Sequence, residues 1–222
     1  MFPSLTQVFQ TLYHGIVDGQ ILSAVGKSIG RLLIGFVIAI TLGLFFGYLI
    51  WRSKFVEDTL GFLVTALQSI PSIVWFPLAI IWFGLNDISI LFIVTIGATW
   101  TMTTSAASGF KNVPKLYQRV AKTFGSSGFH FVRTVILPAS VPQLISGLRI
   151  AWAFAWRALM AGELLGAGGG LGQLLDMGRS LGQMDLVISV MIIIAVVGTI
   201  IDNVVFTRIE RNVQRKWGLT TA

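Results

Sequence analysis

The chain has 222 residues, with 16 Lys and Arg against 9 Asp and Glu, a formal net charge of +7 and no Cys. Hydrophobic residues make up 55% and charged residues only 11%, whereas a soluble domain carries about 25% charged residues. This composition excludes a soluble nucleic-acid-binding domain, which the positive charge alone would favour. The lack of Cys excludes disulfides, thiolate metal sites and Cys nucleophiles. We therefore expect an all-α membrane protein, surrounded by lipid.

The first 31 residues contain no uncharged run long enough to cross a bilayer. Val8, Leu12 and Ile16 recur at helical spacing among polar residues, which is typical of an amphipathic helix in the membrane interface. A polar break follows at 18–20. We interpret 1–31 as an extracytoplasmic amphipathic segment. It has neither the basic start nor the cleavage site of a secretory signal.

Five later stretches are apolar and long enough for a helix to cross about 30 Å of hydrocarbon. They predict a transmembrane domain over 32–207 and a cytoplasmic tail over 208–222. The expected spans are 32–51, 59–86, 88–110, 138–162 and 186–206. Prolines interrupt helical hydrogen bonding in the second span. Gln68, Ser69 and Pro71 are therefore candidate pathway residues, a simple kink being the more common explanation.

The basic residues are divided unequally between the two sides of this predicted bundle. Segments 52–58, 111–133 and 208–222 lie on one side and hold 11 of the 16 Lys and Arg residues, whereas the other side holds three. Lys and Arg accumulate in cytoplasmic loops. We therefore expect the N-terminus outside the cell and the C-terminus in the cytoplasm.

The longest predicted cytoplasmic loop, 111–137, has basic residues, no acid and an apolar stripe. Leu116, Val120 and Ala121 recur at helical spacing, and Gly125 ends or bends this helix. A second short helix is expected at 128–135, before a span that begins at Leu137-Pro138. Ordinary topology-determining charges explain the basic residues most simply, but a docked partner protein better explains two amphipathic helices.

Charged residues inside a span need a structural or functional reason, because each costs at least about 2.5–3.5 kcal/mol on insertion scales. Glu163 follows Arg149 by 14 residues, about 21 Å along one helix, so the two cannot pair within it. We favour structural anchoring for both. Arg157 lies nearer the outside; it suits an anionic cargo or an ion pair with Glu163, Asp176 or Asp185 equally well.

Gly125, nine residues, Val135, one residue and Leu137-Pro138 resemble the EAA loop of ABC-importer permeases. That pattern is Glu-Ala-Ala, three residues, Gly, nine residues, Ile, one residue, Leu-Pro. Segments 68–84, 135–149, 162–172 and 202–217 are similar to the nitrate/sulfonate/taurine/bicarbonate-type branch. Arg119-Val120-Ala121 departs from the Glu-Ala-Ala triplet. The chain also begins where branch members have already crossed the membrane once, so that span is either lacking or upstream.

The resemblance implies the type I ABC-importer permease fold and a multi-pass transport subunit of the bacterial inner membrane, with no catalytic residue and no metal. A second permease subunit, expected to be a copy of this chain, would complete the pore. A cytoplasmic ABC ATPase would dock on the loop 111–137 and bind ATP and Mg²⁺, since this chain has no phosphate-binding loop and no cofactor is expected in it. An extracytoplasmic binding protein would deliver the cargo. The coupling residues that the resemblance implies are Leu116, Arg119, Val120, Ala121, Gly125, Val135, Leu137 and Pro138.

The cargo is expected to be a small anion of the nitrate, sulfonate, taurine or bicarbonate class. The candidate pathway or gate residues are Gln68, Ser69, Pro71, Arg149, Arg157 and Glu163. The same importer type carrying a heterocyclic vitamin precursor is an alternative, and an autonomous channel or carrier is a less favoured one. An intramembrane enzyme is disfavoured because His14 and His130 are predicted on opposite sides of the membrane.

Overall fold

The structure, a computed structural model, describes residues 3–166 and 168–217. These residues form α-helices joined by short π and 3-10 segments, with no strand in the described part. Four helical stretches among these residues are long and apolar enough to cross a membrane, and a bent helix pair brings the number to five where it is counted as one span. This confirms the prediction of an all-α protein with about five spans. The unbroken stretches are Gln20–Arg52, Asp87–Lys111, Gly128–Leu165 and Met184–Arg215.

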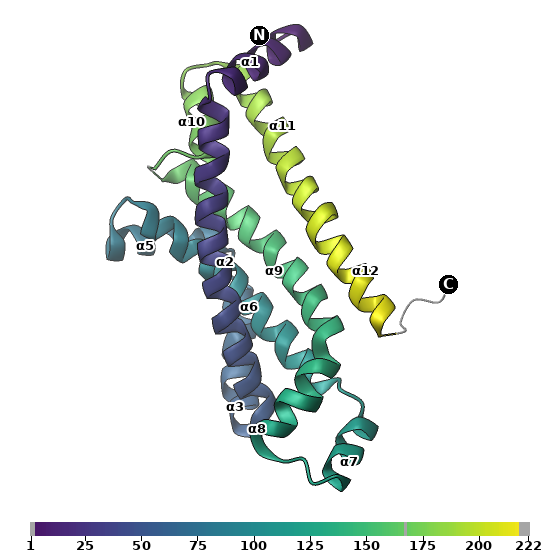
Figure 1. The fold of residues 1–222 in the computed structure, drawn as a ribbon. Helices are drawn as coiled ribbons and strands as arrows, with labels where there is room; N and C mark the ends of the chain where they lie inside the picture. Colours follow the sequence, from purple (N-terminus) through teal and green to yellow (C-terminus); the bar gives the residue numbers. More distant parts are fainter. Residues whose placement is uncertain (1–2, 167, 218–222) are drawn as a thin grey trace.

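The long helices lie side by side, with α1 and α10 at one end of the bundle and α7 and α8 at the other (Figure 1). The first half of the chain contains α1 (Leu5–Val17), α2 (Gln20–Arg52), α3 (Lys54–Val56), α4 (Phe62–Gln68), α5 (Phe76–Phe83) and α6 (Asp87–Lys111). The second half contains α7 (Lys115–Thr123), α8 (Gly128–Phe131), α9 (Leu137–Leu165), α10 (Leu171–Ser180), α11 (Met184–Ile201) and α12 (Thr207–Lys216).

The N-terminal segment predicted at 1–31 is divided between two helices. Ser4 caps α1 through a capping box with Gln7, and Gly19, at φ 75°, makes the turn into α2. The helix that contains the first predicted span, 32–51, therefore begins at Gln20. Arg31 can lie within it because two carboxylates, described below, neutralise its charge.

Helices α2, α6 and α9 form the centre of the bundle, where α2 and α6 approach closely at glycines. A Cβ atom on Gly43 would lie 2.5 Å from the Met102 Cβ, and one on Gly47 would lie 2.5 Å from the Ala106 Cβ. Small residues permit such close packing where lipid supplies no hydrophobic driving force. Met102 and Ala106 are fully buried in the resulting core.

The second predicted span, 59–86, is not one straight helix. α4 ends at Gln68, and a 3-10 turn (Ser72–Trp75) leads into α5. The stretch Ser72–Phe83, which contains the turn and α5, lies at 95° to the stretch Lys54–Gln68. Pro71 precedes the 3-10 turn, and a second proline stands at the start of α5. The prolines therefore break the span as well as kinking it, and α5 projects sideways from the bundle (Figure 1).

The predicted short helix 128–135 is not separate from the span after it. α8 continues through the π segment Val132–Ile136 into α9, giving one 38-residue helix from Gly128 to Leu165. Pro138 has no N–H to donate one turn back and its ring obstructs a normal turn. The wider π turn before it accommodates this defect without ending the helix.

Candidate functional site

The loop between α6 and α9 forms a helix–turn–helix at one end of the bundle, as predicted. Gly125 has a φ of 77°, a conformation that glycine adopts without strain, and it turns the chain after α7. The loop is anchored by Val113, which is buried and whose carbonyl accepts a hydrogen bond from the Gln118 amide at 3.0 Å. The position of α7 is thus fixed by the core of the bundle.

The apolar stripe of α7 is not covered by the rest of the described chain. Leu116 is 67% exposed, Val120 47% and Phe124 86%. Arg119 is exposed beside this stripe, and Ala121 is half-buried. At the foot of α9, Val135 and Pro138 are half-buried and Leu137 is 42% exposed. Exposed apolar residues on a basic helix outside the predicted spans form a surface suited to a protein partner.

A second cluster lies near the opposite end of the bundle, around Glu163. This carboxylate is 1% exposed and accepts hydrogen bonds from Arg31 at 2.8 Å and from Ser28 at 2.7 and 2.9 Å. Arg31 also pairs with Asp87 at 2.8 Å and donates to the carbonyls of Gly168 and Gly169. The network joins α2, α6, α9 and the glycine-rich loop, and it holds the Glu163 carboxylate in the interior of the bundle.

Between the end of α9 and the first turn of α10, the structure describes residues 166 and 168–172 of the glycine-rich segment. A Cβ atom on Gly170 would meet the Glu163 carboxylate at 2.3 Å, and one on Gly172 would meet the Glu163 Cβ at 2.6 Å. The Gly172 N–H also donates to Glu163 at 3.1 Å. Glycine at both positions therefore lets the loop close over the buried carboxylate.

Arg149 forms ion pairs with two acidic residues of the helical stretch Met184–Arg215. Its guanidinium makes a bidentate pair with Asp202, at 2.8 and 2.6 Å, and a third contact with Glu210 at 3.0 Å. These groups are partly exposed, with side-chain exposures between 23% and 38%. The contacts join α9 to the segment that runs from α11 into α12.

Arg157 differs from the other two arginines of the spans. It is exposed at the surface of α9, and in residues 3–166 and 168–217 it makes no ion pair. The three expected partners are engaged elsewhere: Glu163 with Arg31, Asp176 with Arg179 and Asp185 with Thr11. Its guanidinium carbon lies instead 5.2 Å from the centre of the Phe154 ring.

The broken second span borders a small cavity beside Phe154. Gln68 and Pro71 line it together with residues of α6. Ser69 is exposed and donates to the Ala66 carbonyl at 2.6 Å. Gln68 and Pro71 therefore line the same cavity as Phe154, whose ring contacts Arg157. The other two candidate pathway residues, Arg149 and Glu163, belong to the two ion-pair clusters described above.

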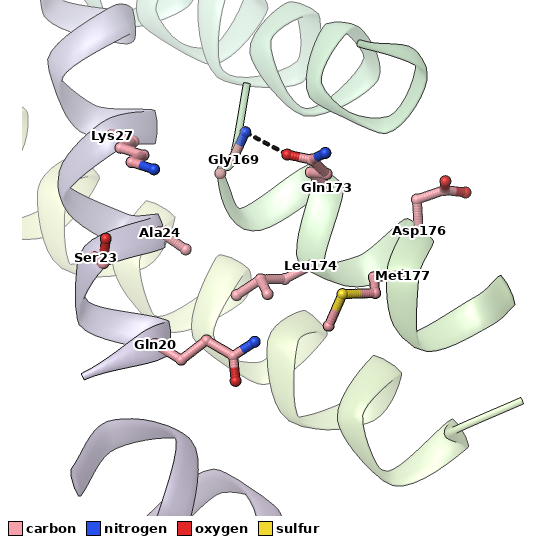
Figure 2. A pocket seen from close by; sticks show the side chains of 10 residues that line it. Gln20, Ser23, Ala24, Lys27, Gly169, Gln173, Leu174, Asp176 and Met177 are labelled. Atoms are coloured by element: carbon pink, nitrogen blue, oxygen red, sulfur yellow. Dashed lines mark hydrogen bonds between the residues drawn. The ribbon is translucent and has the colours of Figure 1, made fainter. Parts of the chain in front are cut away.

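A larger cavity of about 420 Å³ lies between α2 and α10, near the glycine-rich loop. Figure 2 shows Gln20, Ser23 and Lys27 on one side of it and Gln173 on the other, with the Gly169 N–H donating to the Gln173 amide. This cavity lies at the end of the bundle opposite α7 and is lined by both polar and apolar residues. Within the described residues, no group of three His, Asp or Glu side chains is placed to hold a metal ion.

The sequence does not identify Ser28 and Asp87, which complete the cluster around Glu163, or Trp100 and Thr101, which line the cavity beside Phe154. It places Arg31 only among the three basic residues predicted outside the membrane on the extracytoplasmic side. A usable signal was present for Arg31, because Glu163 cannot pair within its own helix and Arg31 borders an uncharged stretch long enough to span the bilayer. No comparable signal marks the other four.

Comparisons with known proteins agree with this architecture. A family model described as a binding-protein-dependent transport system inner membrane component matches residues 39–218. A protein of Methanocaldococcus jannaschii, named as an ABC transporter permease, is 34% identical over 91% of this chain and 78% of its own length. A protein of Bacillus subtilis, named as an aliphatic sulfonates transport permease, is 29% identical over 98% of this chain and 78% of its own length.

A nitrate import permease of Synechococcus elongatus is 32% identical over 65% of this chain and 52% of its own length. Among solved structures, a chain of the methionine ABC transporter MetNI, in its inward-facing conformations, matches with a TM-score of 0.78. That match covers 87% of this chain and 96% of the other at 19% identity, so what the two share is the fold.

Proposed function

The chain belongs to the family of binding-protein-dependent transport system inner membrane components, and from this premise we propose how it works in an importer. As a member, it is a multi-pass permease subunit of an ABC importer, without catalytic chemistry of its own. Two copies of this chain enclose the pore.

In this proposal the partner ATPase docks on α7, and the observation that carries it is the uncovered apolar stripe of that helix. An apolar stripe that is 47% to 86% exposed, on a helix with basic flanks, requires a complementary protein surface. The ATPase holds ATP and Mg²⁺, and its closure moves the bundle by rigid-body rotation through α7. Arg119 stands where an acidic residue is usual, so the facing ATPase groove supplies a carboxylate or a backbone carbonyl.

The proposed orientation places α7 in the cytoplasm and the cavity of Figure 2 at the outer face. It rests on the 11 basic residues of segments 52–58, 111–133 and 208–222, which the charge distribution predicts on one side of the membrane. The N-terminus is then extracytoplasmic and the C-terminus cytoplasmic. The recess between α2 and α10 faces the binding protein that delivers the cargo.

The proposed cargo is a small anion. Arg157 is a permanent cation on an exposed face of a span, and in the described residues no carboxylate pairs with it. Facing lipid would be costly for such a charge, so this face borders a water-filled path or the second subunit. The names of two relatives, which give sulfonates and nitrate as cargo, point to the same class of solute.

The test is a variant that alters α7 alone. Val120→Asp places a charge in the apolar stripe, and we expect the ATPase to be lost from the purified complex and ATP-driven uptake to fall to background. Lys122→Gln, about 200° around the same helix from Val120, is the matched control and retains both. Retention of the ATPase and of full uptake by Val120→Asp would refute docking on this stripe.

A further inference from the structure

We propose that the cavity at the break between α4 and the 3-10 turn binds a small oxyanion on the transport path, with Trp100 and Thr101 as its buried hydrogen-bond donors. This inference rests on the proposed function and names the place where the cargo is held inside the membrane. The cavity has a volume of about 50 Å³ and lies where the broken second span, α6 and α9 meet.

Two buried donors of α6 on this cavity have no partner in the described chain. The indole N–H of Trp100 and the hydroxyl of Thr101 are both enclosed and make no hydrogen bond there. Buried polar groups in folded proteins almost always find a partner, and leaving one without costs stability. Two adjacent exceptions on the wall of one cavity indicate a site that a ligand completes.

Thr101 is exceptional among its neighbours on α6. Thr99 and Thr103 donate to the carbonyl one turn earlier, at 2.7 and 2.8 Å, which is the usual way for a helical threonine to satisfy its hydroxyl. Thr101 is equally buried, at 3% exposure, and does not do so. Its hydroxyl is therefore free to serve a molecule in the cavity.

The chemistry of the wall favours an anion. The indole of Trp100 can only donate a hydrogen bond, and no acidic side chain lines the cavity. Gln68 and Ser72 add an amide and a hydroxyl from the broken span. Phe154 forms another part of the wall and carries the Arg157 guanidinium over its ring, 5.2 Å from the ring centre.

Charge balance points the same way. Arg31 and Arg149 each contact two carboxylates, whereas Arg157 has none among the described residues. A bound anion at this cavity supplies the missing negative charge to that face of the bundle. The break itself agrees with this role, because non-helical backbone at membrane depth is tolerated where it lines a cavity.

The size of the cavity limits the ligand to a small oxyanion or to the oxyanion head of a longer solute. Sites that enclose drug-sized ligands have volumes of about 300–1,000 Å³, several times the 50 Å³ found here. Nitrate, bicarbonate and the sulfonate group share the required chemistry. Each offers several acceptor oxygens to donors that come from three different elements.

The experiment measures thermal stabilisation of the purified importer complex by potassium nitrate or sodium methanesulfonate, with gluconate as the ionic-strength control. We expect at least one small oxyanion to raise the Tm of the wild type. Thr101→Val removes only the hydroxyl, and the concentration for half-maximal stabilisation should rise about tenfold to a hundredfold. Thr101→Ser retains the hydroxyl and should bind nearly as the wild type does.

The matched control is Thr103→Val, on the same helix, where the hydroxyl is already satisfied; its anion affinity should not change. Without ligand, Thr101→Val should be at least as stable as the wild type, because it replaces an unpaired buried hydroxyl by an apolar group of the same shape. Equal anion affinity of Thr101→Val and the wild type, or no stabilisation by either anion, would overturn the site.

ATP-driven uptake in proteoliposomes separates this inference from the proposed function. Anion uptake that does not depend on Thr101 overturns the site and leaves the importer function and its cargo class in place. If the wild-type importer takes up neither anion, the proposed cargo fails, and the site fails with it.

Discussion

Replacing Glu163 by Gln should destabilise the protein severely, because it leaves a buried arginine without its buried carboxylate partner. The carboxylate is 1% exposed and the Arg31 side chain 8% exposed, and they are joined at 2.8 Å. Removing one partner of a buried pair costs about 3–5 kcal/mol. Asp87 still faces Arg31 at 2.8 Å but is 59% exposed, so it compensates only in part.

The expected loss corresponds to a fall in Tm on the order of 10 °C, taking about 2–4 °C per kcal/mol for a chain of this length. Thermal unfolding of the detergent-purified protein, followed by tryptophan fluorescence, measures it. Arg31→Met and the double variant Arg31→Met/Glu163→Gln complete a double-mutant cycle. We expect the double variant to recover most of the loss, since no buried charge is then left unpaired.

The control for this cycle is the exposed pair between Lys54 and Asp58, where the side chains are 77% and 61% exposed. Lys54→Gln should leave the Tm unchanged, because such surface pairs contribute little. The reasoning is refuted if Glu163→Gln shifts the Tm no more than Lys54→Gln does. It is also refuted if the two single effects simply add in the double variant.

Two further substitutions test the packing and the second ion cluster. Gly43→Val should prevent α2 and α6 from closing, because a Cβ there would lie 2.5 Å from the Met102 Cβ; the measurement is the yield of monodisperse protein, and a normal yield contradicts close packing. Arg149→Met should free the C-terminal stretch from α9 by removing the contacts to Asp202 and Glu210. Limited proteolysis should then cut α12 earlier than in the wild type, and an unchanged cleavage pattern contradicts the tether.

The elements that composition and charge determine locally were predictable from the sequence. Apolar runs predicted about five spans, and the matched family and relatives confirm the branch inferred from segments 68–84, 135–149, 162–172 and 202–217. Gly125 correctly marked the end of α7, since a positive φ is a local requirement of that one residue. The amphipathic character of α1 was also predictable, because it follows from a simple helical repeat.

Features that depend on which helices become neighbours were not predictable. Arg31 and Glu163 are 132 residues apart in sequence, so only the packing of α2 against α9 makes the first a partner of the second. For the same reason, the first twelve residues of α2 looked too polar to belong to a span. The prolines of the second span predicted an interruption but not the 95° angle.

The unpaired hydroxyl of Thr101 shows the same limit at the scale of one residue. In the sequence it is one of several threonines and serines along α6 and is indistinguishable from Thr99 or Thr103. Only the three-dimensional arrangement shows that the Thr101 hydroxyl, unlike theirs, donates no hydrogen bond to a backbone carbonyl of its own helix.

The continuous helix from Gly128 to Leu165 has a mechanical consequence. Thirty-eight residues at about 1.5 Å each make a lever about 57 Å long, with the loop that follows α7 at one end and Glu163 near the other. A tilt of about 10° applied at α8 would displace the far end by about 10 Å if the lever stays straight. This helix can bend at the π turn Val132–Ile136 and at Pro138 and Pro142, which lie near its α8 end. Bending there would reduce how much of a movement that begins at α7 reaches the end of the helix near Glu163.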